Sequence, residues 1–183
     1  MRMLAIGLVL WLGAAVPMAA ADQEDPRLDG LFAALAATEN SAAAAPIEAR
    51  IWSIWHEIDD PASARLLRQG SDAMASRAFP VAILSFNRLI DRSPGFAEAW
   101  NRRATLHYLM GNDEASVRDI EETLRLEPRH FGALSGLGLI MLRNDQPMAA
   151  LRSFEAAIEV HPHLPAARAH LEPLRQMVEG EPT

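Results

Sequence analysis

The chain has 183 residues, of which 50% are hydrophobic and 22% charged, and its formal net charge is -7. This suffices for one globular domain or a short solenoid, while the negative charge argues against a dominant role on nucleic acids or anionic membranes. Cysteine and lysine are both absent, which excludes disulfides, thiol nucleophiles, thiolate metal sites, and the lysines of phosphate loops or Schiff bases.

Residues 1–21 have the features of a secretory signal peptide. Arg2 supplies the positive start, residues 4–16 form the apolar stretch, and three alanines ending at Ala21 provide a small-residue cleavage site. The alternative is an uncleaved anchor, but the apolar stretch is shorter than the ~20 residues that a membrane-spanning helix needs. We therefore expect cleavage at about Ala21 and a mature chain that is periplasmic or secreted.

The remainder of the chain repeats itself with a period of 34 residues. Five columns of similar residues keep this step, which is a strong sign of a repeat architecture. One column is proline, two are small, and two are large and mainly apolar. The columns are Pro94, Pro128 and Pro162; Gly70, Ala104 and Gly138; Ala82, Ser116 and Ala150; Phe86, Ile120 and Phe154; and Leu66, Trp100 and Leu134.

This pattern resembles the tetratricopeptide repeat (TPR), a helix–turn–helix unit of 34 residues. In the family's register the repeats run 63–96, 97–130 and 131–164. The resemblance implies an all-α solenoid in which a small residue lies where the two helices of a repeat cross. It also implies that the large residues, such as Phe86, fill the space between successive units. The proline column ends each second helix because proline lacks the N–H that a continuing helix needs.

Both flanks of the array are predicted to be helical. Residues 22–62 are interpreted as a helical hairpin with helices near 27–38 and 46–58. This hairpin is either a degenerate repeat or an unrelated unit packed on the array, and its tryptophans are expected to be packing residues. Residues 165–178 predict an amphipathic capping helix, and residues 179–183 a frayed tail.

Motifs for chemistry are scarce. The glycines at 132, 136 and 138 lack the order of a phosphate-binding loop and fall inside a predicted helix. His161 and His163 flank a proline in a turn, which makes only a weak candidate for a two-ligand metal site. We therefore expect no catalytic residue, no cofactor, no metal and no enzyme activity.

The resemblance implies that the first helices of the repeats line a groove, which in family members binds a peptide or helix of a partner protein. Some TPR domains hold a C-terminal carboxylate in a clamp of basic and asparagine residues. Here Leu67, Ser71, Gly132 and Gly136 occupy clamp positions, so that ligand class is not expected. The inner positions of the family correspond to Leu67, Arg68, Ser71, Met74, Asn101, Arg102, Thr105, Tyr108, Gly132, Ser135, Gly136 and Leu139.

Two groups of groove residues stand out. Gly132 and Gly136 lie four apart on one helix face, although each costs ~1 kcal/mol of helix stability relative to alanine. Such a bare face admits a partner's backbone or side chain, and the alternative is a neutral substitution. Asn101, Arg102 and Tyr108 offer an amide, a forked cation and an aromatic ring, which suit backbone or carboxylate recognition unless this face is merely solvated.

These observations predict a non-catalytic adaptor or scaffold of the cell envelope that binds a peptide or helix of another protein. Two alternatives are a self-assembling structural protein and an accessory subunit of an envelope enzyme complex. Residues 22–60 carry nine acids and two arginines, whereas residues 61–183 are nearly balanced. This leading segment either faces a basic partner, serves self-association, or keeps the chain soluble.

Overall fold

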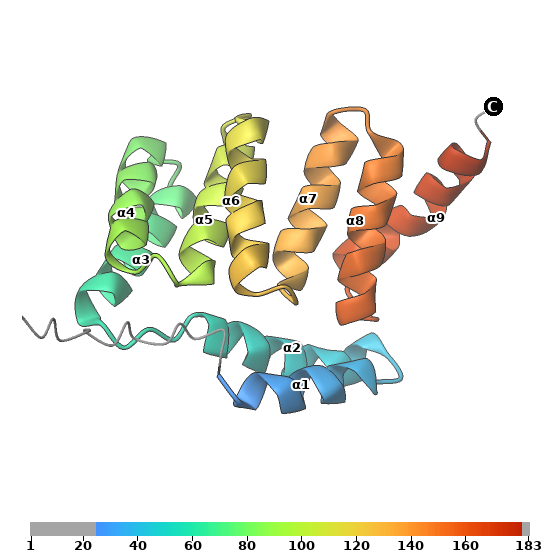
Figure 1. The fold of residues 1–183 in the computed structure, drawn as a ribbon, viewed down its shortest axis with the longest axis horizontal. Helices are drawn as coiled ribbons and strands as arrows, with labels where there is room; N and C mark the ends of the chain where they lie inside the picture. The colour runs from blue at the N-terminus through green and yellow to red at the C-terminus, as the bar shows by residue number, and fades with distance from the viewer. Residues whose placement is uncertain (1–24, 181–183) are drawn as a thin grey trace, which may run out of the picture.

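The computed structural model describes residues 25–180, and within this range the chain forms nine helices and no strand. Three helical hairpins stand side by side in chain order, and a single helix follows the last of them (Figure 1). A further hairpin near the N-terminus lies across one end of the row (Figure 1). The helices are α1 (Arg27–Ala36), α2 (Ser41–Trp55), α3 (Pro61–Ala75), α4 (Phe79–Arg92), α5 (Ala97–Leu109), α6 (Asp113–Leu126), α7 (Phe131–Arg143), α8 (Pro147–Val160) and α9 (Pro165–Glu179).

The turns inside the three hairpins of the row share the same backbone geometry. A residue with positive φ follows the first helix at equivalent positions, namely Arg77 (60°), Gly111 (78°) and Asp145 (55°). The next N–H then donates to the carbonyl five residues back, as from Asn112 to His107 at 2.9 Å. This is the bond that closes a helix through a left-handed residue. Glycine adopts that conformation freely, whereas Arg77 does so at a cost of about 1–2 kcal/mol.

Within a repeat, the two helices approach closely because a small residue faces a large one. A Cβ added at Gly138 would lie 2.7 Å from Cε1 of Phe154, and one added at Gly70 would clash with the Phe86 ring. The large residue therefore packs on the small residue of its own repeat, and Phe86 also shares a core with Ala99 and Leu106 of the following repeat. The second repeat uses Ala104 in the glycine column, where the facing residue is the smaller Ile120.

The N-terminal hairpin α1–α2 does not precede α3–α4 in the row as a further repeat would. It lies across the ends of the hairpins where α5 and α7 begin (Figure 1). Leu28, Leu35 and Trp55 from this hairpin share one apolar core with Phe131 of α7 and Leu174 of α9. The hairpin is thus packed mainly on the third repeat and α9, at the far end of the row from α3.

The second helix of this hairpin begins earlier than the sequence indicates. Pro46 was expected to start it, but the side chain of Asn40 accepts a hydrogen bond from the N–H of Ala43 at 3.0 Å and caps a helix that begins at Ser41. Pro46 therefore lies inside α2. The helix ends at Trp55, so residues 56–58 fall in the connection to α3.

The predicted signal peptide, residues 1–21, lies outside the described residues. Among the helices that the structure describes, none has the length and apolar character needed to cross a membrane.

Two glycines of α7 allow a matched test of the close approach between helices. Gly138→Ala should lower the free energy of unfolding by about 1–3 kcal/mol, because its Cβ would displace the buried Phe154 ring. Gly136→Ala, two residues away, should raise it by about 0.5–1 kcal/mol, because its Cβ would meet only Ile120 at 3.8 Å and alanine favours the helix. Urea unfolding of both variants measures this difference, and equal effects would contradict the packing described.

Candidate partner-binding groove

The main candidate site is a cavity of about 420 Å³ between α5 and α7, which we call the α5–α7 cavity. Residues from α2, from α6 and from the start of α9 complete its lining, which is largely apolar. It contains seven of the groove residues expected from the sequence. These are Asn101, Thr105, Tyr108, Gly132, Ser135, Gly136 and Leu139.

A second, more polar hollow of about 440 Å³ adjoins this cavity, and we call it the Arg102 hollow. It contains Arg102 and His56, and it shares Trp52, Thr105 and other residues with the α5–α7 cavity. Trp52 of α2 therefore borders both spaces. The sequence marked Trp52 as a packing residue, and the structure adds that its half-buried ring forms a wall of the groove.

The four groove residues expected from the first repeat lie apart from both spaces. Leu67 is buried in the core of that repeat, and Met74 packs against the same core. Arg68 is exposed and Ser71 is half-buried. The structure thus brings together the residues from the second and third repeats, but does not join those of the first repeat to them.

The two glycines of the expected bare helix face have different surroundings. A Cβ added at Gly132 would lie 2.8 Å from Cη2 of Trp52, so the indole ring already occupies this part of the face. At Gly136 the nearest atom to an added Cβ is Cδ1 of Ile120 at 3.8 Å, which is an ordinary contact. Only the portion of the face near Gly136 is therefore open to another molecule.

A buried carboxylate that the sequence analysis missed lies beside the groove. Glu98, in the first turn of α5, has no exposed surface. Its Oε1 accepts a hydrogen bond from Nε of Arg102 at 2.6 Å, and its Oε2 accepts one from Nδ2 of Asn101 at 2.8 Å. His56 and His130 each place Nε2 at 3.2 Å from one of its oxygens. Glu98 thus links α2, α5 and α7.

The surroundings of Glu98 keep it ionised. Burial alone would raise the pKa of this carboxyl, but hydrogen bonds from His130 and His56 and the charge of Arg102 hold its pKa well below the usual range. The two expected recognition residues Asn101 and Arg102 are consequently engaged within the chain. Both still line the groove.

The hydrogen-bond partners of His130 and His56 indicate which of their ring nitrogens carry protons. Nδ1 of His130 accepts a hydrogen bond from the N–H of Ala133 at 3.1 Å, so its Nε2 carries the proton that faces Glu98. Nδ1 of His56 lies 2.5 Å from the carbonyl oxygen of Trp52 and donates to it. The hydrogen bond with Glu98 raises the pKa of His56 above its usual value, against the opposing effect of burial.

Other contacts fasten the hairpin α1–α2 to the array. The ring of Trp55 stacks on His130 with 4.2 Å between centroids. Nε2 of His161 lies 3.2 Å from Glu48, and Nε2 of His163 donates to the carbonyl of Thr38 at 2.8 Å. His161 and His163, the weak metal candidates, therefore both contact the hairpin. Among the described residues, no cluster of three potential ligands could hold a metal ion.

A signal for the missed residues exists in the repeat columns. Glu98 occupies a column in which the other residues are Ala64, Gly132 and Ala166. His130 occupies a column with the apolar residues Phe96 and Leu164. A titratable residue in a repeat column that otherwise contains small or apolar residues indicates that this position contacts a segment outside the repeat array, here the hairpin α1–α2.

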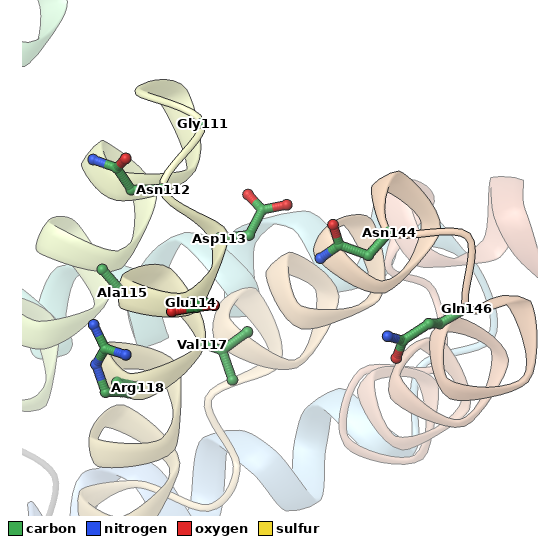
Figure 2. Close-up of a pocket in the computed structure, with 9 residues that line it drawn as sticks. All are labelled: Gly111, Asn112, Asp113, Glu114, Ala115, Val117, Arg118, Asn144 and Gln146. Carbon is green, nitrogen blue, oxygen red and sulfur yellow. The ribbon is translucent and has the colours of Figure 1, made fainter.

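A third space, of about 970 Å³, is an open polar cleft between the turn preceding α6 and the turn between α7 and α8 (Figure 2). Figure 2 shows Asn144 and Gln146 across open space from Asp113. The carboxylate of Asp113 is paired with Arg143. These side chains belong to solvated turns, and their arrangement indicates no specific chemistry.

A row of stacked helical hairpins defines an α-helical repeat scaffold, or solenoid. No family model matches the sequence. A TPR repeat-containing protein of Rhizobium etli is 35% identical over 158 residues, which cover 86% of this chain and 77% of that relative. The chain therefore belongs to the TPR repeat family.

Two solved structures illustrate the shared fold. The TPR domain of Sgt2 from Aspergillus fumigatus has a TM-score of 0.61 and 24% identity, over 68% of this chain and 87% of that one. The first TPR domain of Spaghetti (RPAP3), bound to an HSP90 peptide, has a TM-score of 0.62 and 17% identity, over 67% of this chain and 97% of that one. These likenesses establish the all-α TPR solenoid.

The contact between His56 and Glu98 should make stability depend on pH. Because the pKa of His56 is raised in the folded state, its contribution is fully present below its unfolded pKa of about 6.5 and is lost as pH rises through the folded value. The stability difference between the native chain and His56→Gln should therefore be largest near pH 6 and shrink towards about pH 9. Urea unfolding across this range measures it.

The matched control is Ser76→Ala, because the Ser76 hydroxyl, which donates to the carbonyl of Asp72 at 2.9 Å, does not titrate in this range. Its difference from the native chain should not shrink in the same way. A difference for His56→Gln that grows with pH would contradict the assigned pairing with Glu98.

Proposed function

We propose that this protein is a non-catalytic adaptor of the cell envelope that holds a segment of a partner protein in the α5–α7 cavity. The observation that carries the proposal is the open apolar space at Gly136, on a helix face without side chains. A glycine in the middle of a helix is destabilising, and binding of a partner in the open space beside Gly136 would explain why a glycine is present at this position. The TPR domain of Spaghetti was solved with an HSP90 peptide bound, which shows that this fold can hold a peptide.

The proposed partner segment differs from peptides held by a carboxylate clamp. Leu67, Ser71, Gly132 and Gly136 stand at the clamp positions, and none offers a cation or an amide side chain. Arg102 lies nearby, but its Nε already pairs with Glu98. Apolar contact, rather than capture of a terminal carboxylate, supports binding here.

The groove is tested by Gly136→Leu, which places an apolar side chain inside the α5–α7 cavity. We expect this variant to lose, by about 30-fold or more in affinity, a partner that the native mature protein captures from periplasmic extract. Gly30→Leu is the matched control, because Gly30 lies on the exposed surface of α1 with open space around it. If all three baits capture the same proteins equally, the groove assignment is wrong.

The envelope location rests on the leader-like residues 1–21. Expression of the full chain in a Gram-negative host should give a periplasmic protein whose first residue is Asp22, as read by N-terminal sequencing. Ala21→Arg should block cleavage because the site needs a small residue there, whereas Ala20→Arg, at the tolerant middle position, should be processed normally. A full-length cytoplasmic product would exclude the envelope role.

A further inference from the structure

The face of α7 that lines the groove is already partly covered by an aromatic side chain from another helix, α2. Trp52 projects from α2 onto Gly132, where its ring lies edge-on to Phe131 with 5.4 Å between centroids. It also meets His130 edge-on at 5.5 Å. The absence of a side chain at Gly132 is thus matched to an aromatic residue from a crossing helix.

One turn further along the same face, Gly136 repeats this arrangement without an occupant from the described part of the chain. Residues four apart on a helix lie on one face, about 6 Å apart along the axis. Ile120, Leu139 and Ile140 border the space beside Gly136. At about 420 Å³ the cavity is near the lower limit of the 300–1,000 Å³ of ligand pockets, which suits one or two bulky side chains.

The open space continues directly into the interface between the hairpin and the array. Trp52 borders the α5–α7 cavity as well as sitting on Gly132, so an occupant of the cavity would pack against α2. Trp52 also borders the adjoining Arg102 hollow, which shares Asn101 and Thr105 with the cavity and adds the polar side chains of His56 and Arg102. An occupant of the cavity therefore lies next to a more polar space.

From this juxtaposition we infer that the occupant is an amphipathic α-helix of the partner protein, lying beside α2 and inserting a bulky apolar side chain against Gly136. This inference rests on the proposed function and names the kind of segment bound. A helix is chosen because this chain itself covers the adjoining part of the same face with a helix and an aromatic side chain. The polar residues of the partner helix face the Arg102 hollow.

The experiment uses two displayed peptide libraries against the mature protein. One consists of amphipathic helical peptides with a randomised apolar face, and the other is matched in composition but carries a central proline that prevents a helix. We expect binders from the first library, each with a bulky apolar residue at its centre. Fluorescence anisotropy then measures Kd for each peptide and for versions with alanine at the anchor or proline in the middle.

Gly136→Leu should weaken these peptides by about 30-fold or more, and the alanine and proline versions should bind the native protein similarly weakly. Thr105→Trp provides a second blocked groove, because Thr105 is exposed on α5 and borders the cavity from the opposite side. Gly30→Leu should leave Kd unchanged. Circular dichroism confirms that each variant is folded.

The outcomes separate this inference from the proposed function. Binders that tolerate the central proline, yet are lost in Gly136→Leu, would overturn the helical occupant and leave a groove for extended segments. Peptides that bind the native protein and both blocked variants equally would overturn both the helical occupant and the groove assignment. A failure of both libraries to yield binders would overturn the helical occupant. A concentration-dependent dimer that Gly136→Leu abolishes would assign the space to a second copy of this chain.

Discussion

The arrangement of the groove depends on a buried carboxylate that joins segments far apart in the sequence. Glu98 is fully buried, and removing an ionised carboxylate from water is costly unless other groups replace its hydration. His56 and His130 provide two of these groups, from the end of α2 and the start of α7. Without His56 from the hairpin, this compensation would be incomplete, so burial of Glu98 and docking of α2 favour each other.

That docking determines the shape of the candidate site. Trp52 precedes His56 by one turn, and its ring borders both the α5–α7 cavity and the Arg102 hollow. The hairpin contributes Glu48 and Trp52 to a pocket centred on the second and third repeats. The first-repeat residue Leu67 does not take part because it is buried in the core of its own repeat.

Much of the fold could be predicted because its signals are local and periodic. The 34-residue columns depend on contacts within a repeat, such as Phe154 on Gly138, and these leave a mark in every unit. Of the three left-handed positions, only Gly111 carries the residue type that indicates this conformation. Arg77 and Asp145 adopt the same conformation because the hairpin packing around them requires it, and side-chain identity gives little indication of it.

The position of the hairpin and the network around Glu98 could not be predicted in the same way. Helical periodicity shows that α2 has an apolar face, but several surfaces of the array could cover such a face. The contacts that select one surface, for example Trp55 on His130, occur once and have no period. The site residues Gly132 and Gly136 were found from helix propensity, whereas their different neighbours depend on that single long-range placement.

The return of the hairpin to the far end of the array also bears on how the chain folds. In an open repeat protein each unit contacts only its neighbours, and the ends can unravel independently. Here Arg129 pairs with Asp29 at 2.7 Å, and His163 contacts Thr38, so segments a hundred or more positions apart must meet. Such nonlocal closure raises contact order, slows the search for the native state and ties the array into one cooperative unit.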